Sequence, residues 1–333
     1  MPAEIKNIYN PEKTQNVLEA ENISAAYKTG RTEKIYALRN IDFELEKGSS
    51  AAIVGESGCG KSTLANAFLD LLPKNAVLSG EIRINGRRVS GKSNEELRKI
   101  RGMEAGIIFQ DPGASLNPVF RIREQLIEGI QAHYPDMDKK EMEKKALHLL
   151  KETGLTEPER IYNSYPHRLS GGQQQRVMIA SALSCGPDIL IADEPTTALD
   201  VTVQARIIRL LKELKRSRDL ALILITHDLY LALELSARLI VMYGGEIVED
   251  GIIKGPEDAC HPYTKALFEI IPDLRSKKRD FKVIEGNVPD AGAERDECSF
   301  YDRCPYARRA CKKARPEMKN RKGHRCRCLY PLK

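Results

Sequence analysis

Short, wholly apolar runs alternate with longer stretches of helical periodicity along most of the chain. The apolar runs predict central strands of a parallel sheet, because such strands are covered by helices on both faces. They lie at residues 50–54, 107–109, 189–192 and 221–225, and the helical stretches include 138–153, 172–184, 203–217 and 230–237. Residues 17–27 and 41–46 alternate apolar and polar positions, which predicts half-buried antiparallel strands. The pattern predicts one α/β domain over the first 250 residues, with a helical insertion near 111–185.

The length and composition fit a folded globular protein of about two domains. The chain has 333 residues, of which 41% are hydrophobic and 30% are charged, and this balance excludes wholesale disorder. No apolar run approaches the roughly 20 residues that span a bilayer, and the polar N-terminus lacks the apolar core of a signal peptide. We therefore expect a cytoplasmic protein that reaches a membrane only through partners.

Charge and cysteine content change near the C-terminus. Residues 274–333 hold eighteen Lys and Arg against eight Asp and Glu, whereas the rest of the chain is slightly acidic. Five of the eight cysteines also lie in the last 36 residues. In a cytoplasmic chain, clustered cysteines favour a metal or an iron–sulfur centre over disulfides. We expect an N-terminal tail at 1–16, a main domain at 17–255 and a small cysteine-rich extension at 256–333.

A phosphate-binding loop is predicted directly after the apolar run 50–54. The pattern G-x-x-x-x-G-K-[ST] is formed by Gly55, Glu56, Ser57, Gly58, Cys59, Gly60, Lys61 and Ser62, and Thr63 follows it. Its glycines let successive backbone N–H groups surround phosphate oxygens, and the following helix adds a favourable dipole. We expect Lys61 to reach the β- and γ-phosphates of a nucleotide and Ser62 to ligate Mg²⁺.

Two carboxylates follow the apolar run 189–192, at the edge where open α/β sheets bind ligands. Asp193 is placed to orient the magnesium shell, and Glu194 to polarise the attacking water as general base. Alone, an Asp-Glu pair after a strand is more often a helix N-cap. The phosphate-binding loop in the same chain favours the catalytic interpretation.

A third motif lies about 110 residues after the phosphate-binding loop, where Leu169, Ser170, Gly171, Gly172 and Gln173 precede a helical stretch. Its serine is a typical N-cap, and its glycines leave backbone amides open to an anion. With the two motifs above, the chain resembles the ATP-binding cassette (ABC) family, whose signature is LSGGQ. The resemblance implies a parallel core sheet, an antiparallel β subdomain and a helical signature subdomain.

The resemblance also implies roles for single residues. Gln110 matches the glutamine that joins Mg²⁺ to the transporter contact, Asp200 the aspartate of the D-loop, and His227 the switch histidine at the γ-phosphate. Tyr27 matches the aromatic residue that stacks on adenine, with Tyr36 as its rival. Two simpler interpretations remain open: His227 as a helix cap and Tyr27 as a strand-edge aromatic.

The resemblance narrows to ATPase subunits of bacterial dipeptide and oligopeptide importers. The segments that carry it are 110–118, 194–204 and 261–264, and residues 165–180 are similar to the first of the two ATPases in such systems. It implies a head-to-tail dimer with a second ATPase subunit, in which Ser170 and Gly172 serve the partner's nucleotide. It further implies two membrane permease subunits, an extracytoplasmic peptide-binding protein and a peripheral position on the cytoplasmic face of the membrane.

Other functions stay open at this stage. Nickel importers share the pattern of the peptide importers. A soluble cassette ATPase acting on nucleic acid or the ribosome is disfavoured, because those proteins carry two cassettes or a long coiled-coil insertion. A third interpretation, a redox sensor that binds ATP, is supported only by the cysteines of the extension. Few aromatic residues and no recognised binding module argue against a nucleic-acid partner.

The cysteine spacing in the extension lacks the paired C-x2-C knuckles of zinc ribbons. The peptide-importer family has a similar extension, and the resemblance implies a four-iron cluster on Cys298, Cys304, Cys311 and Cys328, with Cys326 as an extra thiol. Zinc and unligated thiols are the alternatives. The basic charge of the extension fits a solvated surface, neutralisation of thiolates, or contact with acidic lipids or the permease. We also expect ATPase activity to survive replacement of Cys326 or Cys328 by serine, because every phosphate-handling residue precedes position 230.

Overall fold

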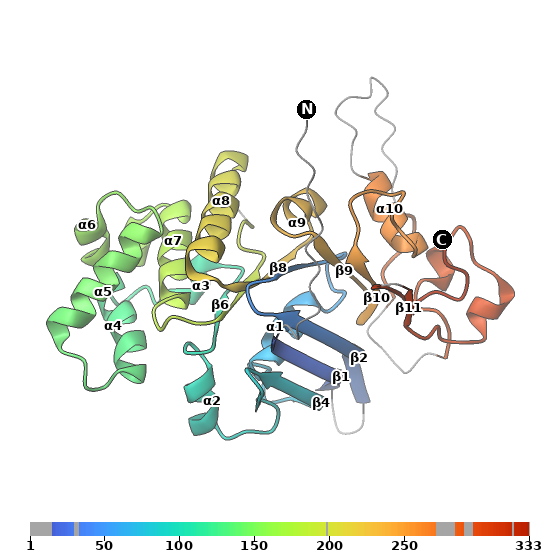
Figure 1. Ribbon diagram of the computed structural model, residues 1–333, viewed down its shortest axis with the longest axis horizontal. Coiled ribbons are helices and arrows are strands. Elements are labelled where there is room, and N and C mark those ends of the chain that lie inside the picture. Colours follow the sequence, from blue (N-terminus) through green and yellow to red (C-terminus); the bar gives the residue numbers. More distant parts are fainter. Residues whose placement is uncertain are drawn as a thin grey trace.

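The computed structural model describes residues 15–29, 33–197, 199–270, 284–289, 296–321 and 323–332. It is built around two sheets, with helices gathered at one end and the C-terminal extension at the other (Figure 1). The tail expected at 1–16 lies almost wholly outside the described residues. In the described residues, no helix is long and apolar enough to cross a membrane.

The larger sheet has eight strands in the order β11-β12-β10-β9-β3-β8-β7-β6. Their bounds are β3 Ser50–Val54, β6 Ala105–Ile108, β7 Ile189–Asp193, β8 Ala221–Thr226, β9 Arg238–Tyr243, β10 Glu246–Ile252, β11 Lys319–Arg321 and β12 His324–Cys326. The strands from β9 to β6 are parallel, and β10 to β12 continue the sheet antiparallel. The four apolar runs of the sequence are β3, β6, β7 and β8, so the predicted parallel core is confirmed.

The smaller sheet is antiparallel, in the order β2-β1-β4-β5. Its strands are β1 Asn16–Thr29, β2 Glu33–Glu46, β4 Ala76–Ile84 and β5 Arg87–Arg88. Strand β2 begins earlier than the alternation at 41–46 predicts, because register shifts in its pairing with β1 interrupt the simple period of two. Helix α1 (Lys61–Phe68) packs on this sheet, with the rings of Phe43 and Phe68 5.1 Å apart.

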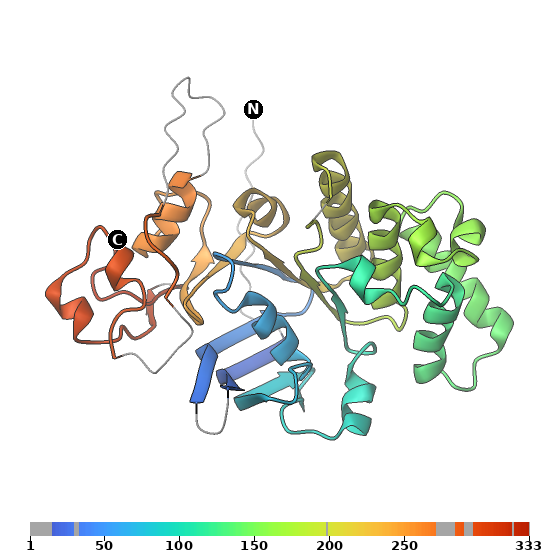
Figure 2. The same cartoon turned by 180° about the vertical axis from the view of Figure 1, so that it is seen from behind.

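The helical insertion expected near 111–185 is present at the end opposite the extension (Figure 2). It contains α3 Pro112–Ser115, α4 Ile122–His133, α5 Lys139–Glu152, α6 Pro158–Tyr162 and α7 Gly171–Ala182. These helices share one apolar core with the inner faces of β7 and β8. Three further helices complete the cassette: α2 Asn94–Ile100, α8 Val201–Arg218 and α9 Leu229–Leu235.

The C-terminal extension is continuous with the larger sheet. Strand β12 pairs with β10, and Phe300 packs against Tyr243 and Tyr263 in a core cluster that also contains cassette residues. The other elements of the extension are α10 Pro262–Ile270, η2 Tyr301–Arg303 and η3 Arg309–Lys312. The extension differs from the cassette in composition. In the structure, however, it is joined to the cassette by the larger sheet and by this shared core.

Buried acids on β10 account for part of the basic charge of the extension. Glu246, Glu249 and Asp250 are almost fully buried. Glu246 pairs with Arg315, and Asp250 accepts hydrogen bonds from Arg238 and Arg325. Burial alone raises the pKa of Asp250, but the hydrogen bonds and charges of Arg238 and Arg325 outweigh it and lower that pKa below its ordinary value.

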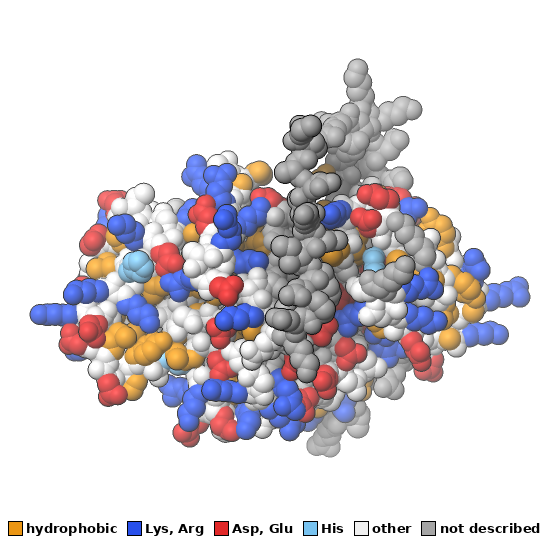
Figure 3. All heavy atoms as spheres, in the orientation of Figure 1, with side chains coloured by type: hydrophobic (Ala, Val, Ile, Leu, Met, Phe, Trp, Pro, Cys, Tyr) orange, Lys and Arg blue, Asp and Glu red, His pale blue; other side chains and the backbone are white. Residues whose placement is uncertain are grey.

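Glu249 is satisfied by its own set of donors. Its carboxylate accepts the backbone N–H groups of Cys260 at 2.6 Å and His261 at 2.8 Å, and it lies 2.6 Å from His324 Nε2. The extension therefore docks by matching basic side chains and backbone donors to buried carboxylates. Elsewhere on the face shown in Figure 3, basic and acidic side chains are interspersed, with several Lys and Arg at the edge over the extension.

Candidate functional site

The loop of residues 55–60 joins β3 to α1 and needs its glycines for space. A Cβ atom on Gly60 would lie 2.5 Å from the carbonyl oxygen of Ala37, and one on Gly55 would lie 2.3 Å from that of Met242. Gly60 also has a positive φ of 103°, where a side chain would strain the backbone. Gly58 faces open space. The loop therefore wraps tightly on one side and stays open on the other.

Lys61 is buried at the centre of this loop. Its Nζ donates hydrogen bonds to the carbonyl oxygens of Gly55 at 2.8 Å and Glu56 at 3.0 Å. No side chain caps α1, whose N-cap is Gly60, so its first backbone donors remain available. An ammonium group and open amides at a helix N-terminus suit phosphate oxygens.

Ser62 and Asp193 meet across the end of β7. The hydroxyl of Ser62 donates to Asp193 Oδ1 at 3.1 Å, and Asp193 is 5% exposed. Burial raises the pKa of Asp193, and the neighbouring Glu194 raises it further, against the lowering effects of Ser62 and Lys61. A divalent cation at this point would offset the buried charge. A hydroxyl and a carboxylate are oxygen ligands of the kind Mg²⁺ prefers, so these residues fit the ion.

The other predicted catalytic groups contact the side chain of Glu194. Its carboxylate accepts hydrogen bonds from Gln110 Nε2 and Thr197 Oγ1, both at 2.9 Å, and it lies 3.4 Å from His227 Nδ1. The residue has a positive φ of 45°, and its N–H is held by the carbonyl of Ile225 at 2.8 Å. A non-glycine residue in this conformation carries strain that the surrounding contacts must support. The sequence did not reveal Thr197, because it matches no catalytic motif.

These groups surround one open cavity of about 620 Å³. It is lined by Tyr27, Ile35, Ala37, Ser57, Gly58, Gly60, Lys61, Ser62, Thr63, Gln110, Glu194, Thr197 and His227. The hydroxyl of Tyr27 lies 3.3 Å from Thr63 Oγ1, whereas the Tyr36 ring lies beneath Arg39. The structure therefore places Tyr27, and not its rival Tyr36, at the cavity.

The signature residues, 169–173, lie outside the lining of this cavity. Ser170 caps α7 through a reciprocal pair of hydrogen bonds with Gln173, at 3.1 and 3.4 Å. A Cβ atom on Gly172 would lie 3.0 Å from Val203 at the start of α8, so this glycine permits close packing. Asp200 caps α8 through the N–H of Val203 at 2.9 Å. Among these described residues, neither the signature nor Asp200 lines the cavity of the phosphate-binding loop.

Four cysteines of the extension line one small pocket. They are Cys298, Cys304, Cys311 and Cys328, the four residues that the sequence assigns to a cluster. Burial is the main cause that raises the pKa of Cys298 to about 12 and that of Cys328 to about 11, and the neighbouring thiols add to both shifts. Cys326 is absent from this pocket and lies opposite Glu249 in the pairing of β12 with β10. An all-sulfur donor set of this kind suits an iron–sulfur cluster. In the described residues, no three of these four sulfur atoms lie within 4.8 Å of one another, the spacing that a single ion would need.

His261, Pro262 and Tyr263 form the start of α10. His261 is 1% exposed, and its Nδ1 accepts the N–H of Tyr263 at 3.1 Å, which caps the helix. Burial lowers the pKa of His261 to about 3, so the ring is neutral at physiological pH. The segment therefore has a structural role at the start of α10.

Two family models match the chain. The model described as ABC transporter matches residues 38–197, and the one described as oligopeptide/dipeptide transporter, C-terminal region, matches residues 252–311. Together they cover the phosphate-binding loop, the signature, both carboxylates of β7 and three of the four pocket cysteines.

Several known proteins are similar to this chain over most of their length. A probable peptide ABC transporter ATP-binding protein of Sinorhizobium fredii is 42% identical over 88% of this chain and 88% of its own. The oligopeptide transport ATP-binding protein AppD of Bacillus subtilis is 40% identical over 94% and 96%. Among solved structures, the dimeric ATP-binding cassette MJ0796 bound to ADP and Pi superposes with a TM-score of 0.63 at 35% identity, over 72% of this chain and 99% of that chain.

Proposed function

Because this chain belongs to the family of ABC transporter ATP-binding proteins, we propose that it is the ATP-hydrolysing subunit of an importer of dipeptides or oligopeptides. The observation that carries the ATPase assignment is the convergence of Lys61, Ser62 and Glu194 on one cavity, with Asp193 hydrogen-bonded to Ser62 behind it. The peptide assignment rests on the match of residues 252–311 to the C-terminal region of oligopeptide and dipeptide transporters and on relatives named for peptide transport.

The mechanism follows from the position of each side chain. Lys61 and the open amides of α1 bind the phosphates of ATP, and Tyr27 supports the adenine ring. Ser62 and Asp193, with Gln110, would hold Mg²⁺, which would supply positive charge against the phosphates. Glu194 takes the proton of the attacking water as general base, and Gln110, Thr197 and His227 fix its carboxylate.

A second ATPase subunit completes the site in this proposal. Ser170, Gly171, Gly172 and Gln173 present the N-terminus of α7 on the surface, away from the chain's own cavity. Their amides and serine hydroxyl suit the phosphates of a nucleotide held by a partner, and Asp200 lies at the adjoining N-terminus of α8. Head-to-tail pairing brings each signature to the other subunit's ATP.

We propose that the permease contact lies beside Gln110. An open groove of about 450 Å³ is lined by Phe109, Leu116 and Phe120, among other residues. Phe109, Val119 and Phe120 are 40%, 71% and 48% exposed, which is unusual for large apolar side chains clustered near a catalytic residue. We assign this surface to two membrane permease subunits, which place the chain peripherally on the cytoplasmic face of the membrane and link it indirectly to a peptide-binding protein.

The thiol pocket is proposed to hold a four-iron cluster on Cys298, Cys304, Cys311 and Cys328. The donor set is all sulfur, and the pocket brings together cysteines that are up to 30 positions apart. When bound, the cluster joins four points of a loop-rich segment that buries few apolar side chains. This is a structural role, and ATP hydrolysis uses no electron from it.

Glu194→Gln tests the catalytic assignment. The variant keeps the shape of the site but cannot take a proton, so ATP turnover should fall by about 10² to 10⁴-fold. ATP binding should persist and trap a closed dimer. Lys61→Ala is the matched comparison, since it removes a ground-state phosphate contact and should weaken ATP binding itself. Turnover of Glu194→Gln within tenfold of wild type, measured by phosphate release, would refute Glu194 as the base.

A further inference from the structure

The C-terminal region binds Glu56, a residue of the phosphate-binding loop, through two side chains. Arg303 makes a bidentate ion pair with its carboxylate, from Nη1 to Oε2 at 2.7 Å and from Nη2 to Oε1 at 2.9 Å. The hydroxyl of Tyr263 accepts the backbone N–H of Glu56 at 3.0 Å. Both residues lie more than 200 positions from the loop in sequence. The loop is therefore held by a part of the chain outside the cassette.

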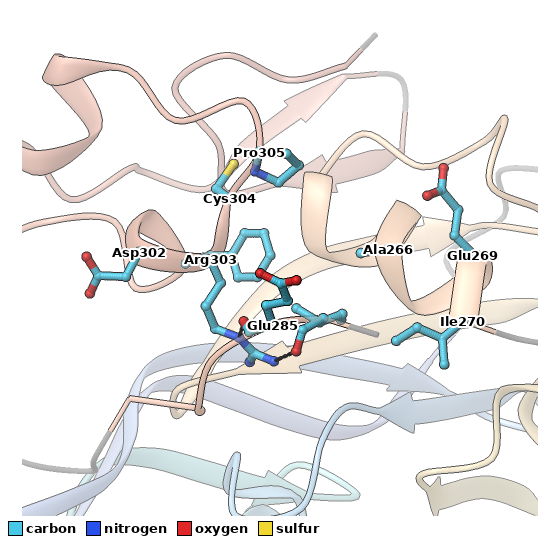
Figure 4. A pocket seen from close by; sticks show the side chains of 10 residues that line it. Ala266, Glu269, Ile270, Glu285, Asp302, Arg303, Cys304 and Pro305 are labelled. Carbon is cyan, nitrogen blue, oxygen red and sulfur yellow. Dashed lines mark hydrogen bonds between the residues drawn. The ribbon is translucent and has the colours of Figure 1, made fainter. Parts of the chain in front are cut away.

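Hydrogen bonds hold the guanidinium group of Arg303 in one orientation. Besides Glu56, its guanidinium donates to the hydroxyl of Tyr243 and to the carbonyl oxygens of Ile284 and Glu285. All of its nitrogens are engaged, and its side chain is 5% exposed. Figure 4 shows the guanidinium directed toward residues 284–285, away from the neighbouring thiol of Cys304. Such a fork fixes the position of the carboxylate that it binds.

The fixed residue is in turn bonded to the phosphate-binding lysine. The carbonyl oxygen of Glu56 accepts a hydrogen bond from Lys61 Nζ at 3.0 Å. The N–H, carboxylate and carbonyl of Glu56 are thus held by Tyr263, Arg303 and Lys61 respectively. A shift of Arg303 or Tyr263 would change the backbone that directs Lys61.

We propose that Arg303 and Tyr263 are positioning residues for ATP, through which the C-terminal region sets the nucleotide affinity of this chain. The inference rests on the proposed function in that the ligand is ATP. It adds that the loop reaches its phosphate-binding conformation only when the extension is docked.

Two conservative variants of the full-length chain test this role. Arg303→Lys keeps the positive charge but loses the fork, and Tyr263→Phe keeps the ring packing but loses the acceptor for the Glu56 N–H. With a fluorescent, non-hydrolysable ATP analogue and Mg²⁺, each should raise the dissociation constant about tenfold. Hydrogen exchange of the amides in residues 55–60 should also become faster in both variants.

Arg315→Lys is the matched control. Arg315 pairs with the buried Glu246 of β10, so it also ties the extension to the cassette, but it does not contact the phosphate-binding loop. It should leave the dissociation constant within twofold of wild type. An equal loss of affinity in Arg315→Lys would reduce the effect to general destabilisation and overturn the proposal. So would unchanged affinity in both Arg303→Lys and Tyr263→Phe. Failure of the wild-type chain to bind the analogue would instead overturn the ATPase assignment itself, and the inference with it.

Discussion

The cassette and the C-terminal extension differ in what holds them together. In the cassette, buried apolar side chains form continuous clusters on both faces of β3, β7 and β8. In residues 296–332 the described buried apolar side chains are Phe300, Cys311, Pro316 and Cys326. The extension depends instead on ion pairs to the buried acids of β10 and on four converging cysteines. We therefore expect the fold of the extension to respond to pH and, if the proposed cluster is bound, to loss of metal, to which an apolar core is largely indifferent.

This difference explains what the sequence could predict. The strands β3, β6, β7 and β8 follow from local apolar runs, and the phosphate-binding loop and Asp193–Glu194 follow from motifs next to them. Strand β6 ends at Ile108 and not at Phe109, whose side chain is exposed in the groove beside Gln110. Helix α2 begins at a capping box of Ser93 and Glu96, a local S-x-x-E signal that lies outside the apolar runs and motifs above.

The docking of the extension could not be predicted locally. Glu246, Glu249 and Asp250 look like exposed charges in sequence, because their partners Arg315, His324 and Arg325 lie about 70 residues later. The expectation that the ATPase site is independent of the cysteines rested on motif positions alone. The contact of Arg303 with Glu56 joins the two regions, and the survival of ATPase activity without the cysteines stays a prediction.

The largest expected effect on the extension comes from its cysteines. Cys328→Ser removes one pocket thiol, so the anaerobically purified chain should lose its iron and visible absorbance, and the extension should exchange its amides rapidly. Structural metals contribute folding free energy directly, which is why the loss should be nearly complete. Iron content, absorbance and hydrogen exchange measure it.

Cys326→Ser is the control for that change, because Cys326 lies outside the pocket. It should keep about four irons per chain. Loss of metal in Cys326→Ser alone would show that Cys326, and not Cys328, is the fourth ligand. A colourless wild-type chain with one zinc would replace the cluster by zinc.

Breaking the charge pairing on β10 should have the next largest effect. Asp250→Asn leaves Arg238 and Arg325 without a carboxylate in a buried setting, which costs about 3–5 kcal/mol in the free energy of unfolding. Glu234→Gln breaks the exposed pair with Lys212 and should cost less than about 1 kcal/mol. Denaturant unfolding of both variants measures the difference. Equal losses would show that β10 is not a special docking strand.

Acidification should weaken the extension through His261. In the unfolded chain its pKa is about 6.5, and burial lowers it to about 3 in the folded chain, so the unfolded state binds the extra proton between these values. The contribution of neutral His261 to the free energy of unfolding is fully present above pH 6.5. It declines by about 1.4 kcal/mol per pH unit toward pH 3.

His261→Asn isolates this contribution, because asparagine can still cap α10 but does not titrate. The variant should lose stability less steeply than wild type between pH 6 and 4, roughly the window set by the two pKa values. Thermal midpoints across this range measure the slopes. Identical slopes would assign the acid sensitivity to other groups.

Peptide uptake by cells tests the central claim most directly. Cells that lack this chain would be supplied with the wild type or with Glu194→Gln at equal abundance, and the entry of a labelled dipeptide and a labelled oligopeptide would be measured. The account predicts uptake of at least one peptide with the wild type and none above background with Glu194→Gln. Equal uptake with both proteins, or no peptide uptake with either, would contradict it.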